Sequence, residues 1–110
     1  MTQFSTDRGS QYYQIFMRNY RFKNPICSDP FGIHKKLNET VATKDVHHII
    51  PYKKDISKCY AEDNLISLCP ICHMAIHGKK KYISYILNII GIAEYKKSLG
   101  YLYYNLQKEN

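Results

Sequence analysis

The sequence has few of the features that mark secreted or membrane proteins. Its first ten residues are polar and contain no apolar segment of a secretory signal, and no later run approaches the ~18–20 apolar residues of a membrane span. No internal repeat and no low-complexity linker divides the 110 residues. We therefore expect one domain, residues 1–110, that is intracellular, cytoplasmic and without a membrane partner.

Acidic residues are also scarce. Nine Asp and Glu stand against sixteen Lys and Arg, which gives a net charge of +7 and a pI of about 9.2. This excess favours an anionic partner of extended shape, nucleic acid first, although basic residues on a protein surface are often only solvated. The candidates for phosphate contacts are Arg18, Arg21, Lys53, Lys54, Lys79, Lys80 and Lys81.

The four cysteines are expected to be free thiols or metal ligands, because disulfides are rare in a chain without a secretory signal. Cys69 and Cys72 form a Cys-x-x-Cys half-site for structural zinc, and Cys27 is a third candidate. The fourth ligand would be Cys59 or His34, both at unusual spacing. In the alternative, Cys27 and Cys59 are small apolar residues and the C-terminal helices supply the stability that zinc gives elsewhere.

Apolar spacing and turn residues predict an α+β fold. Residues 1–9 are expected to be a frayed leader, 25–43 a loop and 52–63 a polar surface loop. The regular elements are a helix over 10–22, paired strands over 41–50 and 65–68, a short helix over 70–78, and two further helices within 80–107 joined near Gly91.

Histidines gather in the first predicted strand and the short helix. His73 and His77 are four residues apart, so in a helix their imidazoles lie on one face and can bind one cation. His47 and His48 are adjacent and would point to opposite faces of a regular strand, so both serve one site only if the strand twists or ends there. In the alternative, one of the two is catalytic and the other stabilises the hairpin.

These residues together carry a family resemblance. The run from His47 to Pro51, then Asn64 and Leu65, then 68–73 with His77 behind it, resembles the HNH endonuclease motif. The resemblance implies a ββα-metal (His-Me finger) core over 41–78, with an N-terminal helix and a C-terminal helical extension over 80–107. More narrowly, the chain resembles the small HNH nucleases found beside phage terminase genes.

The resemblance also implies roles. His48 corresponds to the general base, and Asn64 to the residue that ties back the loop and fixes the orientation of that base. His47 and His73 correspond to ligands of one divalent cation (Mg, Mn, Ni or Zn), and His77 to a further ligand or a phosphate contact. The implied activity is metal-dependent hydrolysis of DNA with low sequence specificity.

Partners follow from the same resemblance. DNA is the expected substrate, a phage terminase subunit is an expected partner, and the C-terminal helices are expected either to cover the strands or to pair with a second copy. The alternative function is a non-catalytic, zinc-stabilised DNA-binding module in which the histidines serve structure.

Overall fold

A computed structural model describes residues 8–53 and 56–102, so the predicted contact Lys54 and the end of the predicted extension, 103–107, lie outside the described residues. The fold is α+β, as predicted, and no helix in the described part of the chain is long and apolar enough to cross a membrane. Two short 3-10 turns, Ile56–Lys58 and Glu62–Asn64, accompany the main elements. These are α1 (Gln11–Lys23), α2 (Ile33–Lys36), β1 (Asp45–His48), β2 (Leu65–Leu68), α3 (Pro70–Ile76) and α4 (Lys80–Leu102).

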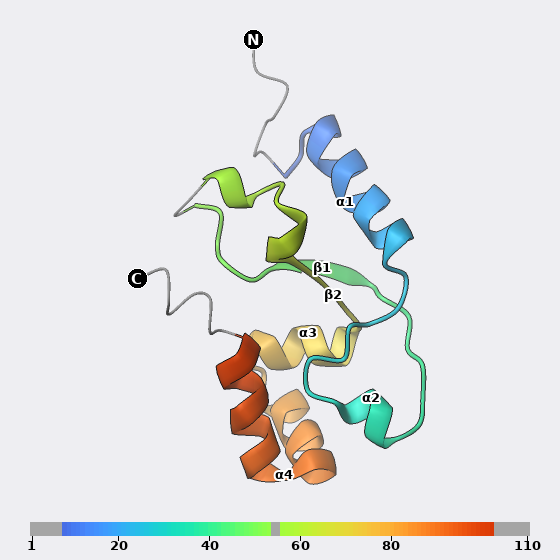
Figure 1. The fold of residues 1–110 in the computed structure, drawn as a ribbon, viewed down its shortest axis with the longest axis vertical. Helices are drawn as coiled ribbons and strands as arrows, with labels where there is room; N and C mark the ends of the chain where they lie inside the picture. Colours follow the sequence, from blue (N-terminus) through green and yellow to red (C-terminus); the bar gives the residue numbers. More distant parts are fainter. Residues whose placement is uncertain (1–7, 54–55, 103–110) are drawn as a thin grey trace.

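The N-terminal helix α1 forms where the aromatic spacing predicted it. The hydroxyl of Ser10 accepts from the backbone N–H of Tyr13 and caps the first turn. Tyr13 and Met17 are buried against the hairpin, and the Tyr20 hydroxyl donates to the carbonyl of Leu65 at 3.1 Å. The helix therefore lies across the hairpin (Figure 1), with its opposite face exposed.

The hairpin is shorter than predicted. β1 pairs antiparallel with β2 from Asp45 opposite Leu68 to His48 opposite Leu65, so the predicted strand 41–50 is too long at both ends. Ala42 makes only an isolated bridge, with Ile26. Beyond His48, the backbone N–H of Ile50 donates to the side-chain oxygen of Asn64 at 2.8 Å, and the side-chain nitrogen of Asn64 donates to the carbonyl of Ile50 at 2.9 Å. Because both backbone groups of Ile50 bond to this side chain, the backbone pairing of β1 with β2 does not continue past His48.

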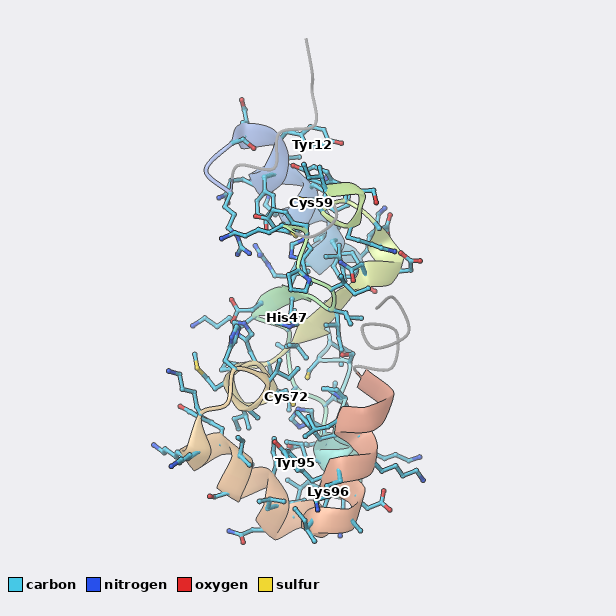
Figure 2. All side chains as sticks on the ribbon, turned by 90° about the vertical axis from the view of Figure 1, so that its left-hand side faces the viewer. Tyr12, His47, Cys59, Cys72, Tyr95 and Lys96 are labelled. Atoms are coloured by element: carbon cyan, nitrogen blue, oxygen red, sulfur yellow. The ribbon has the colours of Figure 1, made fainter. Side chains whose placement is uncertain are left out.

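The sequence predicts a polar surface loop over 52–63, and this prediction is wrong for the side chains that face α1. Tyr52 and Cys59 are buried in a small hydrophobic cluster with Tyr13, Met17 and Leu65, on the α1 side of the hairpin (Figure 2). The aromatic ring of Tyr60 packs edge-on against Phe16 of α1, with ring centroids 4.8 Å apart. The polar lysines of this segment are consistent with a loop, but its apolar residues anchor it to α1.

A second hydrophobic cluster lies on the other side of the hairpin, among α2, α3 and α4. Its buried members include Phe31, Ile33, Leu68 and Ile86. At Gly91 the backbone has φ 84° and ψ 164°, so α4 is two helical halves that meet at an angle, as predicted (Figures 1 and 2). The second half returns Tyr95 to stack on Phe31 at a centroid distance of 5.6 Å. The C-terminal helices thus cover the α3 side of the hairpin.

Candidate functional site

Three histidine side chains converge where β1 meets α3. His47 comes from β1, and its ring centroid lies 5.9 Å from that of His73 and 5.4 Å from that of His77. The Nε2 atoms of His73 and His77 are 2.9 Å apart, and one ligand nitrogen from each of the three rings falls within 4.8 Å of the others. The helical spacing of His73 and His77 thus gives the convergence that the sequence predicted. The donor set fits a single metal ion.

His48 lies on the opposite side of the strand. It is buried beside Tyr13 and Tyr52, and its Nε2 atom lies 3.0 Å from the carbonyl oxygen of Cys59. Because a carbonyl oxygen only accepts, this contact requires the hydrogen to be on Nε2. The neutral ring then has its lone pair on Nδ1, which is the form that can remove a proton from water.

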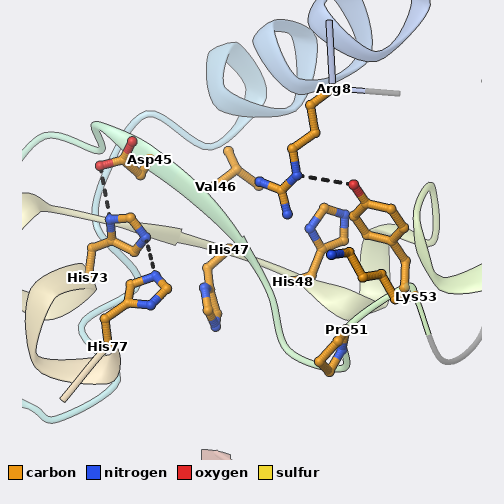
Figure 3. Close-up of a pocket in the computed structure, with 10 residues that line it drawn as sticks. Arg8, Asp45, Val46, His47, His48, Pro51, Lys53, His73 and His77 are labelled. Carbon is orange, nitrogen blue, oxygen red and sulfur yellow. Dashed lines mark hydrogen bonds and ion pairs between the residues drawn. The ribbon is translucent and has the colours of Figure 1, made fainter. Parts of the chain in front are cut away.

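Although His47 and His48 point to opposite faces, both line one pocket. β1 ends at His48, and the pocket extends along the whole of this short strand and past its end, so side chains of both faces line it (Figure 3). Its volume is about 320 Å³. The remaining lining residues are Arg8, Asp45, Val46, Pro51, Tyr52, Lys53, His73 and His77.

Three histidines that line this pocket, His47, His48 and His77, have lowered pKa values, which favours their neutral form. Burial, with the neighbouring His77 and His73, lowers the pKa of His47 to about 4. Burial also lowers the pKa of His48, with a further contribution from the positive charge of Arg8, against the hydrogen bond to Cys59. The pKa of His77 is lowered by burial, His73 and Lys79. Neutral imidazoles are required both for metal ligation and for a general base.

Asn64 fixes the segment that carries the carbonyl partner of His48. Its side-chain oxygen accepts from the Ile50 N–H at 2.8 Å, and its side-chain nitrogen donates to the carbonyls of Ile50 (2.9 Å) and Lys58 (3.0 Å). These bonds join the end of β1 to the turn that leads to Cys59. Asn64 thus contacts both the end of β1 and the segment that leads to the acceptor of His48.

Asp45 stands behind His73. A carboxylate oxygen of Asp45 lies 3.2 Å from the Nδ1 atom of His73, whereas Nε2 of the same ring faces His77. The Nδ1 atom is buried and has no hydrogen-bond partner of good geometry. A carboxylate on the outer ring nitrogen is the usual second contact of a metal-ligating histidine, so Asp45 is placed for this role.

A second group of ligands forms a buried site on the α3 side of the hairpin, within the hydrophobic cluster of α2, α3 and α4. It joins Cys27, His34, Cys69 and Cys72, whose ligand atoms all lie within 4.8 Å of one another. His34 Nε2 is 3.3 Å from Cys69 Sγ and 3.6 Å from Cys72 Sγ. Of the two residues predicted as the fourth member, His34 lies here and Cys59 lies in the cluster under α1. This Cys3His set fits a metal ion.

Local contacts fix the position and the ring orientation of His34 in this second site. Asp29 caps α2 by accepting from the backbone N–H groups of His34 and Lys35, at 3.0 and 2.9 Å. The carboxylate of Glu39 contacts Nδ1 of His34 at 2.8 Å, which turns Nε2 toward the thiols. Burial acts against the charged form of His34, but the hydrogen bonds with Glu39 and Cys69 outweigh it and raise the pKa. Hydrogen bonds from Cys27 and Cys72 lower the pKa of the Cys69 thiol, and hydrogen bonds with Cys27 and Cys69, together with burial, raise the pKa of Cys72. Without a cation, the thiolate of the cluster is therefore Cys69.

The predicted basic contacts fall in three places. Lys53 lines the histidine pocket. Arg18 and Arg21 lie exposed on α1, where they line a separate shallow depression with Phe22, Pro25 and Thr43. The remaining three, Lys79, Lys80 and Lys81, are exposed where α3 passes into α4.

Sequence reasoning missed three residues of these sites. Asp45 and Glu39 each contact the outer nitrogen of a candidate ligand histidine, and Arg8 lines the histidine pocket. The prediction of a frayed leader over 1–9 is wrong for Arg8, because its Nε donates to the Tyr52 hydroxyl at 3.1 Å. Of these three residues, Asp45 could have been predicted from the sequence, because residues two positions apart on a strand lie on the same face and Asp45 precedes His47 by two.

A two-stranded hairpin followed by a helix, with histidines from both around one pocket, is the ββα-metal arrangement. Comparison with protein families agrees, since the sequence model described as HNH endonuclease matches residues 25–79. The chain belongs to the HNH endonuclease family. No curated protein and no solved structure matched the chain.

Proposed function

We propose that the chain is a metal-dependent DNA endonuclease with His48 as general base and one divalent cation held by His47, His73 and His77. One observation carries the proposal. A buried imidazole with its Nε2 fixed on the Cys59 carbonyl shares a pocket with three further histidines that converge on one point. A non-catalytic module has no need of a histidine held in the tautomer of a base.

The residues divide the chemistry of hydrolysis. With Nε2 engaged by the carbonyl of Cys59, Nδ1 of His48 removes the proton from the attacking water. The lowered pKa of His48 keeps the ring in its basic form at neutral pH. A divalent cation, when bound, supplies charge stabilisation at the scissile phosphate and the leaving oxygen.

Low sequence specificity is part of the proposal. The basic side chains proposed as DNA contacts, Lys53 at the pocket and Arg18 and Arg21 on α1, are suited to phosphate contacts, which carry no sequence information. We therefore expect cleavage of unrelated duplexes at similar rates and a steep loss of affinity as salt rises. Cleavage of one short sequence alone would contradict this part of the proposal.

Plasmid nicking tests the function. Wild type and His48→Ala would be compared with Mg²⁺, Mn²⁺ and Ni²⁺, each after metal titration shows that the variant still binds the cation. We expect nicking by wild type and its loss in His48→Ala. If wild type nicks no faster than His48→Ala under all three cations, the chain is the DNA-binding module of the alternative reading.

We further propose that the Cys3His site holds a structural zinc ion. Three thiols and one imidazole are a donor set for zinc, and the site is fully buried, with no side left open for substrate. The thiolates also accept backbone N–H groups, from Asp29 to Cys27 at 3.4 Å and from Cys72 to Cys69 at 3.5 Å. Metal analysis of the purified chain is expected to give one zinc per chain from this site.

The expectations on partners and organisation also stand as proposals. Residues 1–110 act as one domain, a terminase subunit is a partner by resemblance, and a dimer would use α4. Exposed Tyr85 and Ile92, at 43% and 57% exposure, are available on that helix. Sedimentation of wild type and Ile92→Asp would test the dimer, and co-purification with terminase subunits would test the partner.

A further inference from the structure

Arg8 is held in a defined position at the histidine pocket. Its Nε donates to the hydroxyl of Tyr52 at 3.1 Å, and its guanidinium carbon lies 5.5 Å from the centroid of the Tyr52 ring. The backbone carbonyl of Arg8 accepts from the side chain of Gln14 at 2.6 Å, which ties the residue to α1. In the described part of the chain, no carboxylate pairs with this guanidinium. A fixed cation that no carboxylate of residues 8–53 and 56–102 neutralises is suited to an anion from outside the chain.

The location of Arg8 relative to the other site residues limits what this anion is. Arg8 lines the same pocket as His48 on one side and the three converging histidines on the other (Figure 3). An anion that reaches the guanidinium therefore also reaches the base and the candidate cation. In the proposed reaction, the group with this position is the phosphodiester that is cut.

We propose that Arg8 is a catalytic residue that donates its terminal N–H groups to the nonbridging oxygens of the scissile phosphodiester, with Tyr52 as its positioning residue. This inference rests on the proposed function. A planar guanidinium with one nitrogen anchored presents its remaining donors in a fixed fork, which matches two phosphate oxygens. Negative charge on these oxygens grows in the transition state, so their contacts with Arg8 are stronger there than in the bound substrate.

The covalent step itself is ordinary hydrolysis. A bond forms between the water oxygen and phosphorus, and the bond from phosphorus to the leaving 3′ oxygen breaks. The water proton passes to Nδ1 of His48, and the leaving oxygen takes a proton from solvent. Arg8 exchanges neither a proton nor an electron, so it acts only through its charge and its hydrogen bonds.

Arg21 is the matched control for Arg8. It has the same side chain and belongs to the same end of the chain, but it lies in the depression on α1 with Phe22 and Thr43 and does not line the histidine pocket. A contact of Arg21 with DNA would be a contact with a phosphate away from the cut. The two arginines should therefore affect different steps.

The test measures binding and chemistry separately in the full chain. Single-turnover cleavage of a labelled duplex at saturating enzyme would be compared among wild type, Arg8→Ala, Arg8→Lys, Tyr52→Phe and Arg21→Ala. The duplex affinity would be measured with Ca²⁺, and the melting temperature of each variant would be recorded. Free guanidinium ion would be added to the two alanine variants.

The expected result is a separation of rate from affinity. Arg8→Ala should cleave about 100-fold more slowly, as for the loss of one preorganised transition-state donor, while its duplex affinity changes by less than about 3-fold. Arg8→Lys and Tyr52→Phe should lose less, and guanidinium ion should restore part of the rate of Arg8→Ala only. Arg21→Ala should lose affinity and keep its rate at saturation.

Several results would overturn the inference. If Arg8→Ala cleaves as fast as wild type at saturation, Arg8 is not catalytic and the proposed function stands. Equal losses of affinity in Arg8→Ala and Arg21→Ala, without a change of rate, would make Arg8 a general phosphate contact. If Arg8→Ala does not fold, the rate of Arg8→Lys decides in the same way. Absence of cleavage by wild type with every cation would remove both the proposed function and this inference.

Discussion

The carboxylate of Asp45 and the ring of His73 face each other across 3.2 Å, on the side of the imidazole that points away from His77. Asp45 is the first residue of β1, which carries His47, and His73 is the middle residue of α3, whose C-cap is His77, so the contact links the two elements that position the three histidines. Glu39 and His34 repeat the relationship at the Cys3His site, with 2.8 Å between carboxylate and ring. Each candidate metal site thus has a carboxylate behind one of its histidines.

Replacing Asp45 by Asn should weaken cation binding at the three-histidine site by about 10- to 100-fold, because a metal-bound histidine loses orientation and basicity without its carboxylate. Titration calorimetry with Mn²⁺ or Co²⁺ would measure the change. Glu39→Gln is the matched control, since its carboxylate serves the other site and should leave this affinity unchanged. Equal Mn²⁺ affinity in Asp45→Asn and wild type would show that the carboxylate does not act on the ligand.

Asn64→Ala should destabilise the fold by about 2–4 kcal/mol, because three buried hydrogen bonds are lost together. Urea unfolding monitored by tyrosine fluorescence or circular dichroism would measure the change. Asn19→Ala, at an exposed asparagine of α1 outside the pocket, is a control for the loss of an amide side chain. A cost of Asn64→Ala no greater than that of Asn19→Ala would contradict the role of Asn64 as the tie between Ile50 and Lys58.

The order of motif residues allowed much of the site to be predicted. The four-residue spacing of His73 and His77 is local geometry, so a helix is enough to bring them together. The difficulty of His47 and His48 on opposite faces was also correctly stated from the strand period. Both histidines can line one pocket because the strand pairing ends at His48. The hydrogen bonds of Asn64 with Ile50 set this end, and no local sequence pattern predicts them, because Asn64 lies sixteen residues after His48.

Other parts of the sites depend on the path of the chain. His34 and Cys59 were equivalent candidates in the sequence, and the turn capped by Asp29 places His34, whereas packing under α1 buries Cys59. Arg8 has no periodic or motif signal, because its position follows from one contact with Tyr52, forty-four residues away. Contacts of this kind arise only after the elements have packed, so local sequence rules do not contain them.

The histidine pocket should make the fold sensitive to mild acid. The pKa of His47 is about 4 in the folded chain, mainly through burial, against ~6.5 in an unfolded chain. Between these values only the unfolded chain binds the proton, so this contribution to stability is complete above pH ~6.5 and is lost as the pH falls toward 4. His47→Asn removes the group and should lose less stability over this interval than wild type.

Thermal unfolding from about pH 7.5 to about pH 5.5, without added divalent cation, would measure this difference. The raised pKa of His34 acts in the opposite direction but is shared by both proteins, so the comparison isolates His47. Parallel melting curves of wild type and His47→Asn across the interval would contradict the lowered pKa.

Replacement of cysteine by serine should have opposite effects on the metal content at Cys69, which belongs to the Cys3His site, and at Cys59, which does not. Cys69→Ser should release the metal ion of the site and destabilise the chain strongly, because Cys69 is fully buried and its thiolate accepts bonds from His34 and Cys72. Cys59→Ser should keep the metal, since its side chain lies in the cluster with Tyr13 and Leu65, and should cost only the burial of a hydroxyl. Native mass spectrometry reads the metal content of each variant directly. Loss of the metal in Cys59→Ser would assign the fourth position to Cys59, and retention of one metal per chain in Cys69→Ser would remove Cys69 from the site.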